Sequence, residues 1–89
     1  MLGSKDKCFI CGKPHVDRHH IFGGRNRQMS EAQDCVVYLC RDHHREAHDH
    51  PNTGLDLYLK RTMQKQFEMT SSREQFLKLF EKSYMAVNN

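Results

Sequence analysis

Residues 39–50 read LCRDHHREAHDH, and the spacing of their metal-binding side chains decides the fold. Cys40 and His43 are separated by two residues, which lets both side chains of a turn reach one metal ion. His44 and His48 are four residues apart, so on a helix both imidazoles stand on one face. Because neighbouring helical residues point about 100° apart, His43 and His44 are expected to serve two different ions.

A second chelating pair, Cys8 and Cys11, has the same two-residue spacing as Cys40 and His43. The two pairs together predict a Cys3His zinc site, since the cost of closing the long loop between them grows only logarithmically with its length. The alternative, buried or partly oxidised thiols, is less compatible with two pairs of this spacing. Cys35 has no partner by spacing and is interpreted as a small buried hydrophobe beside a strand.

The composition is that of one small soluble domain. A chain of 89 residues allows a single domain over 1–89, and it buries too little apolar surface to be very stable without further support. No apolar run could span a membrane and no signal peptide is visible, which favours the reducing cytoplasm. The net charge of +3 is compatible with a nucleic-acid backbone as partner but does not name a function.

The front of the chain, residues 8–50, contains every cysteine and histidine. It is predicted to begin with a knuckle-like turn at the first cysteine pair, followed by a strand over 18–22. A polar loop from 23 to about 34 and a second strand over 36–39 come next. A helix over 42–50 completes this part, and it ends there because a proline follows.

Two amphipathic helices are predicted over residues 55–87, where apolar side chains recur at spacings of three and four. The first is marked by Leu55, Tyr58, Leu59, Thr62, Met63 and Phe67. The second begins at a capping-box signature, Ser71 with Glu74, and its apolar face comprises Phe76, Leu77, Phe80, Tyr84 and Val87. Both helices are interpreted as support for the front unit, and a monomer is favoured over a dimer.

The adjacent histidines His19 and His20 lie on the first predicted strand, so their side chains project to opposite sides. They are therefore not expected to chelate one ion equally. One of them could complete a three-histidine metal site with His44 and His48, while the other stays free near the same centre to accept a proton from water. The alternative is an accidental pair of surface histidines.

At this point the pattern resembles the HNH endonucleases of the ββα-metal class, in particular small phage and bacterial proteins with a zinc knuckle. The resemblance covers residues 8–48 and rests on Cys8-x2-Cys11, Asp17-Arg18-His19-His20-Ile21, Gly23-Gly24 and Leu39-Cys40-x2-His43-His44-x3-His48. It implies an α+β fold, namely a ββα-metal (HNH) unit with a Cys3His zinc knot, followed by two packed C-terminal helices. By this resemblance His19, His44 and His48 bind the catalytic metal and His20 is the general base.

The middle residue of the motif departs from the family pattern. The family usually has an asparagine five residues before the second cysteine pair, where this chain has Cys35. Asn26 is the candidate to take over the role of pinning the loop that orients the base, and the alternative is that no residue does. Asp17 is a candidate to orient a ligand histidine through a hydrogen bond, or it simply begins the strand.

The resemblance implies a metal-dependent endonuclease that hydrolyses DNA phosphodiester bonds with low sequence specificity, in the cytoplasm of a bacterial or phage-infected cell. It would hold a structural Zn²⁺ and one catalytic divalent ion, either Mn²⁺, Mg²⁺, Ni²⁺, Co²⁺ or Zn²⁺, of which imidazole ligands favour the transition metals on affinity. Arg18, Arg25, Arg27 and Arg45 are candidates for backbone phosphate contacts, with ordinary solvated arginines as the equal alternative. A protein partner could add specificity.

Two non-catalytic alternatives compete with this interpretation. A Cys2His2 finger would use Cys8, Cys11, His44 and His48, but its central loop would be far longer than a finger loop and would leave Cys40 unused. A zinc-containing module that binds nucleic acid without cutting it is the stronger competitor, because the middle asparagine is not in its usual place.

Overall fold

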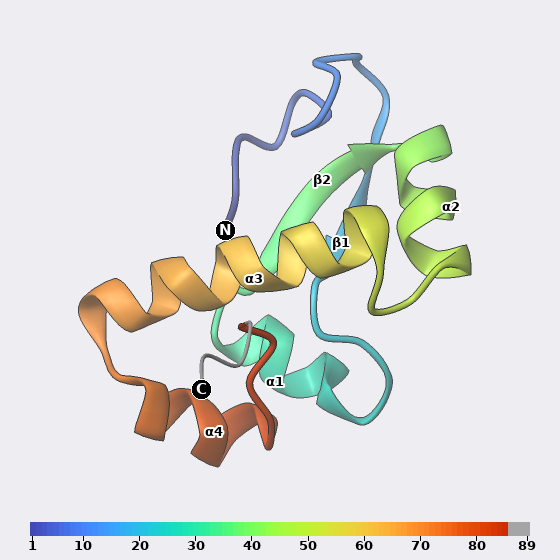
Figure 1. Cartoon of the computed structure of the whole chain (residues 1–89). Coiled ribbons are helices and arrows are strands. Elements are labelled where there is room, and N and C mark those ends of the chain that lie inside the picture. Colours follow the sequence, from blue (N-terminus) through green and yellow to red (C-terminus); the bar gives the residue numbers. More distant parts are fainter. Residues whose placement is uncertain (86–89) are drawn as a thin grey trace.

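A two-stranded antiparallel sheet lies at the centre of the computed structural model, which describes residues 1–85 (Figure 1). Strand β1 (Val16–His20) pairs with β2 (Val36–Cys40), with Val16 opposite Cys40 and His20 opposite Val36. The sequence places the first strand at residues 18–22, two residues too late. The pairing ends at His20, and Ile21 and Phe22 turn into the core, where both are 1% exposed.

Helix α2 (Arg41–Asp49) follows β2 without a loop, and the last strand residue, Cys40, occupies the N-cap position with extended backbone. The helix ends one residue before His50, as the following Pro51 predicts. Strands β1 and β2 with α2 make the predicted ββα unit, and α2 lies beside the sheet at the end where β2 finishes (Figure 1).

The sequence prediction is wrong for the segment between the strands, where it expects a polar loop as far as Asp34. The structure instead contains a 3-10 turn, η1 (Gly24–Asn26), and helix α1 (Arg27–Ala32). Most α1 residues are good helix formers, and the buried Ser30 hydroxyl anchors the helix to the core. Its Oγ accepts a hydrogen bond from the Phe22 amide (3.0 Å) and donates one to the Phe22 carbonyl (2.7 Å).

The C-terminal part contains two helices as predicted, α3 (Gly54–Thr70) and α4 (Arg73–Phe80). The N-cap of α4 is Ser72, whose hydroxyl accepts from the Gln75 amide, and not Ser71 as the sequence suggests. Helix α4 also ends earlier than predicted, since Glu81 adopts left-handed backbone with a φ of 76°. Tyr84 packs on the core from beyond the helix end, and Val87 lies outside the described residues.

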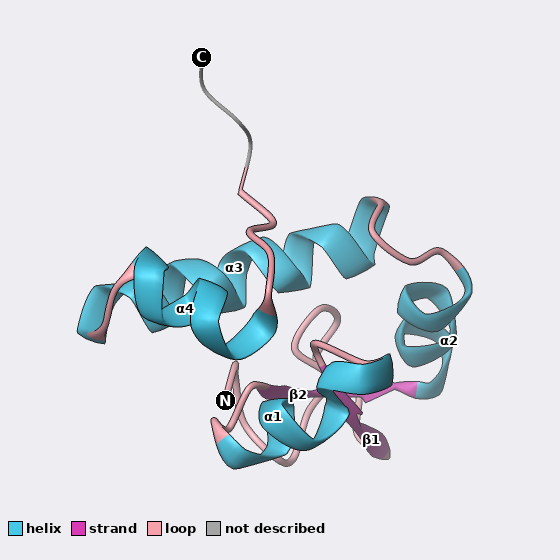
Figure 2. Ribbon diagram, turned by 90° about the horizontal axis from the view of Figure 1, so that it is seen from below, coloured by secondary structure: helices cyan, strands magenta, loops and turns pink. Residues whose placement is uncertain are grey.

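The core lies between two layers. Figure 2 shows α3 and α4 in one layer and the sheet with α1 in the other. Phe22, two residues beyond β1, packs with its ring centroid 5.3 Å from that of Phe76 and 4.5 Å from that of Phe80. These contacts fasten helix α4 to the segment that follows His20. No helix within residues 1–85 has the length and apolar character needed to cross a membrane.

Candidate functional site

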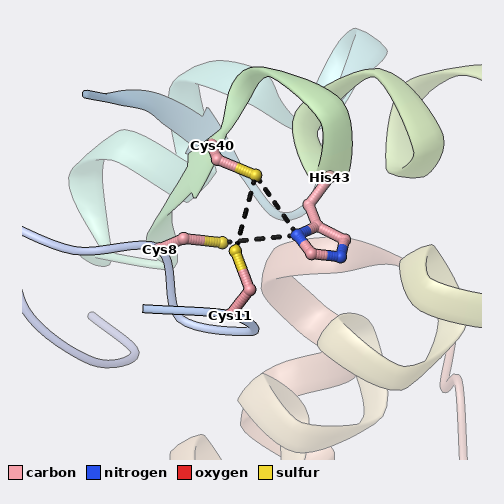
Figure 3. A group of neighbouring side chains, drawn as sticks. All are labelled: Cys8, Cys11, Cys40 and His43. Carbon is pink, nitrogen blue, oxygen red and sulfur yellow. Dashed lines mark hydrogen bonds between the residues drawn. The ribbon is translucent and has the colours of Figure 1, made fainter. Parts of the chain in front are cut away.

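The two predicted chelating pairs converge at one point. The ligand atoms of Cys8, Cys11, Cys40 and His43 all lie within 4.8 Å of one another. Nδ1 of His43 is 3.5 Å from Sγ of Cys8 and 3.3 Å from Sγ of Cys40, and the sulfurs of Cys11 and Cys40 are 3.8 Å apart (Figure 3). All the cysteines are free thiols. The structure therefore confirms the predicted Cys3His arrangement, which is consistent with a zinc knot.

A tight turn holds the first cysteine pair against the sheet. The Gly12 amide donates to the Cys8 carbonyl at 2.8 Å, and Gly12 has a φ of 77°, a conformation that favours glycine. The Phe9 amide donates to the carbonyl of Tyr38 on β2 at 3.0 Å. The turn is thus attached to the strand that carries Cys40, so both pairs face each other.

Within this cluster the environment favours the thiolate of Cys8, whereas the neighbouring thiols of Cys8 and Cys40 help to raise the pKa of Cys11. Burial on its own would raise the pKa of the Cys8 thiol, but hydrogen bonds from the backbone of Cys40, Cys11 and Ile10 and from the His43 side chain outweigh it and lower the pKa to about 6. Three sulfurs and one imidazole nitrogen are the donor set of a structural zinc site, so the residues present fit this metal.

A second group of imidazoles lies where β1 faces α2. His19 is only 8% exposed, and its ring centroid is 5.1 Å from that of His44. Burial, followed by the nearby charge of His44, lowers the pKa of His19 to about 4, which keeps this imidazole neutral near pH 7. Within residues 1–85 its buried Nε2 atom has no hydrogen-bond partner. A metal ion would satisfy this atom, so His19 fits the role of a ligand.

Asp17 contacts His44 across the gap between β1 and α2. Its Oδ2 atom lies 3.2 Å from Nδ1 of His44, as expected for a carboxylate that orients a ligand histidine. His48 lies one turn further along α2 with an 81% exposed side chain, 4.0 Å from a carboxylate oxygen of Asp49. In the described part of the chain His19, His44 and His48 line one pocket, but they do not form a tight donor cluster like that of the thiols.

That pocket, of about 520 Å³, brings together residues from both halves of the chain. His19 and His20 line it together with Arg18 and Arg27. A neighbouring pocket of about 260 Å³ is lined by Asp17 and Arg45, and His44 and His48 line both pockets. Arg25 lines neither of these two and pairs with Glu81 at 3.0 Å.

Helix α3 adds pocket residues that sequence reasoning missed. Asp56 and Lys60 both line the histidine pocket, and Nζ of Lys60 lies 2.8 Å from Oδ2 of Asp56. Both side chains are nearly buried, at 6% and 11% exposure. An Asp and a Lys four residues apart at the start of an otherwise amphipathic helix could have signalled this pair, but nothing in the sequence places it beside the histidines.

His20 projects to the opposite side of β1 from His19, as the strand geometry predicts. Its side chain is 18% exposed, and its Nε2 atom lies 2.7 Å from Oε1 of Glu31 on α1. Sequence reasoning missed Glu31, because it lies in the segment expected to be a loop. Asn26, the candidate middle residue, donates from Nδ2 to the Phe80 carbonyl at 3.3 Å and is not hydrogen-bonded to His20 within residues 1–85.

Comparison with known proteins gives one family. The family described as "Putative HNHc nuclease" matches residues 2–82, which is nearly all of the part that the structure describes. No curated protein and no solved structure matches the chain significantly.

Proposed function

The chain belongs to this HNHc nuclease family, and we propose that it is a metal-dependent endonuclease that hydrolyses DNA phosphodiester bonds with low sequence specificity. The observation that carries the proposal is the contrast between His19 and His20. Among residues 1–85, Nε2 of the buried His19, beside His44, has no hydrogen-bond partner, whereas His20 lines the same pocket with an 18% exposed side chain. One suits a metal ligand and the other a proton acceptor.

His19, His44 and His48 would hold the catalytic divalent ion, and Asp17 would orient His44. When bound, the ion supplies positive charge against the phosphate and the leaving oxygen. His48 lines the same pocket with an 81% exposed side chain, which leaves its ring room to reach the ion. Imidazole ligands favour Mn²⁺, Co²⁺, Ni²⁺ or Zn²⁺ over Mg²⁺ on affinity. The Cys3His cluster would hold a separate structural Zn²⁺.

His20 would take the proton from the attacking water. Arg18 and Arg27 line the same pocket, but Arg18 is paired with the Glu31 carboxylate, so Arg27 would carry the positive charge that a phosphate group needs next to the histidines. Arg45 in the neighbouring pocket would contact the next phosphate along the strand. Contacts of this kind are made to the phosphate backbone of the nucleic acid and do not distinguish one base from another. They support low sequence specificity for the chain alone.

The test is cleavage of supercoiled plasmid by zinc-loaded protein freed of other metals, with Mn²⁺, Mg²⁺, Co²⁺, Ni²⁺ and additional Zn²⁺ added separately. His20→Ala is the test variant, and His50→Ala, at the exposed end of α2, is the matched control. We expect nicked or linear plasmid with at least one ion, loss of at least about 100-fold in rate for His20→Ala, and wild-type rates for the control.

Retained cleavage in His20→Ala would contradict the assignment of the base. Folded, zinc-loaded protein that retards plasmid or RNA in a gel but cuts neither with any ion would favour the competing function, a non-cleaving zinc module that binds nucleic acid. Parallel reactions with single-stranded DNA and RNA determine which nucleic acid is cut.

A further inference from the structure

Glu31 on α1 is the centre of a chain of side-chain contacts that crosses the sheet. Its carboxylate accepts two hydrogen bonds from Arg18, from Nε at 3.3 Å and from NH2 at 2.5 Å. Its Oε1 atom also lies 2.7 Å from Nε2 of His20. Arg18 in turn donates from NH1 to the hydroxyl of Tyr38, its direct partner on β2, at 2.8 Å.

These contacts restrict where the Glu31 carboxylate can be. The bidentate bond to Arg18 fixes the plane of the carboxylate, and the Tyr38 hydroxyl fixes Arg18 from the neighbouring strand. Arg18, followed by His20, also lowers the pKa of Glu31, so the group stays ionised. An ionised carboxylate can only accept hydrogen bonds, so the hydrogen between it and His20 belongs to Nε2 of the imidazole.

The other ring nitrogen of His20 is then the one with a free electron pair. Within residues 1–85, Nδ1 of His20 has no hydrogen-bond partner, and His20 lines the histidine pocket. A neutral imidazole has one donor nitrogen and one acceptor nitrogen, so fixing the hydrogen at Nε2 makes Nδ1 the acceptor.

We infer that Glu31 is the positioning residue of the general base, holding His20 in the tautomer and ring orientation that presents Nδ1 to water. This inference rests on the proposed function. The proton moves from the attacking water to Nδ1, the water oxygen bonds to phosphorus, and the bond from phosphorus to the leaving oxygen breaks, with solvent water protonating that oxygen. Asn26, the sequence candidate for this task, contacts Phe80 instead.

Glu31 can be changed without disturbing the core, because its side chain is 53% exposed. The chain also offers a matched control in Glu68, which accepts two hydrogen bonds from Arg73, at 3.1 and 3.3 Å, and one from Gln64 at 2.8 Å. Glu68 therefore has the same kind of arginine pair plus a neighbour, but it does not line the histidine pocket.

The experiment compares zinc-loaded wild type with Glu31→Ala, Glu31→Gln and Glu68→Ala. Cleavage is measured as kcat and KM with the ion that supports it, and histidine-ring ¹H–¹⁵N NMR spectra at pH 8 report which nitrogen of His20 carries hydrogen. For Glu31→Ala we expect kcat to fall about 100-fold, KM to stay within about twofold, and His20 to lose its Nε2–H preference.

Glu31→Gln should recover most of kcat, because its amide oxygen still accepts from Nε2, and Glu68→Ala should match wild type in kcat and tautomer. The inference is overturned if Glu31→Ala keeps the wild-type kcat, or if His20 of the wild type carries its hydrogen on Nδ1. A wild type that cuts no substrate with any ion would instead contradict the proposed function and, with it, a catalytic role for Glu31. The NMR spectra would still decide whether Glu31 holds the ring.

Discussion

The Oδ2 atom of Asp17 lies 3.2 Å from Nδ1 of His44, joining β1 to α2 beside the histidine pocket. Where the carboxylate accepts this hydrogen bond, Nδ1 of His44 carries the hydrogen and Nε2 is the nitrogen with an electron pair for a metal. A carboxylate in this relation to a ligand histidine raises its affinity for the ion.

Asp17→Ala is therefore expected to weaken binding of the catalytic ion by about 10- to 100-fold without changing the zinc content. Calorimetric titration of Ni²⁺ into zinc-loaded protein measures this. Asp49→Ala is the control, because Asp49 lies beside His48 at 4.0 Å and is 57% exposed. Equal Ni²⁺ affinity in Asp17→Ala and wild type would count against an orienting role.

Removing a ligand of the Cys3His cluster should unfold the front unit. Cys40→Ser is expected to lose bound zinc and the cooperative unfolding transition, since zinc held by this cluster would add folding free energy that a small core does not supply. Cys35→Ala is the comparison, because Cys35 is fully buried but lies outside the cluster. It should keep one structural zinc and lose only about 1 kcal/mol. Atomic absorption and thermal unfolding give the two readouts, and a Cys40→Ser protein that retains zinc would refute the ligand set.

The buried neutral state of His19 makes stability depend on pH. Its folded pKa of about 4 lies below the ordinary value of 6.5, so between these values the unfolded chain binds the extra proton. The contribution of neutral His19 to the free energy of unfolding is complete above pH 6.5 and is lost as the pH falls towards 4. Between pH 7.5 and 5.5 we expect wild type to lose about 1 kcal/mol more than His19→Gln.

Denaturant unfolding at the two pH values, with His50→Gln as an exposed control, tests this difference. For each protein the change in the free energy of unfolding between the two pH values is compared. The titration of the zinc ligands cancels in this comparison, because all three proteins share these ligands. If this change in the free energy of unfolding is the same in His19→Gln as in wild type, His19 does not resist protonation in the folded state.

The Ser30 hydroxyl satisfies both backbone groups of Phe22 in the buried segment that follows His20. Ser30→Ala leaves a buried amide and a buried carbonyl without a partner, and each such group costs about 1–3 kcal/mol. We expect a destabilisation of at least about 2 kcal/mol in denaturant unfolding. Ser4→Ala, at an exposed serine, should leave stability unchanged. A Ser30→Ala protein with the same free energy of unfolding as Ser4→Ala, within experimental error, would contradict the anchoring role.

The predictions that rested on the spacing of neighbouring residues were the reliable ones. The Cys8–Cys11 and Cys40–His43 pairs were identified because two residues of separation is a local geometric property of a turn. The end of α2 at Asp49 was predictable because Pro51 restricts the residue before it. The polar composition of residues 27–32 hid helix α1, whose anchor is a contact between Ser30 and Phe22 that no local pattern encodes.

The candidate site divides in the same way. Sequence alone determined the opposite directions of His19 and His20, because successive side chains of a strand point to opposite faces. Only the tertiary structure decided that Glu31 contacts His20, that Asp17 contacts His44, and that Asp56 and Lys60 line the histidine pocket. The partners in each contact are far apart along the chain, and they meet through the pairing of β1 with β2 and the packing of helices against that sheet, which short-range spacing does not encode.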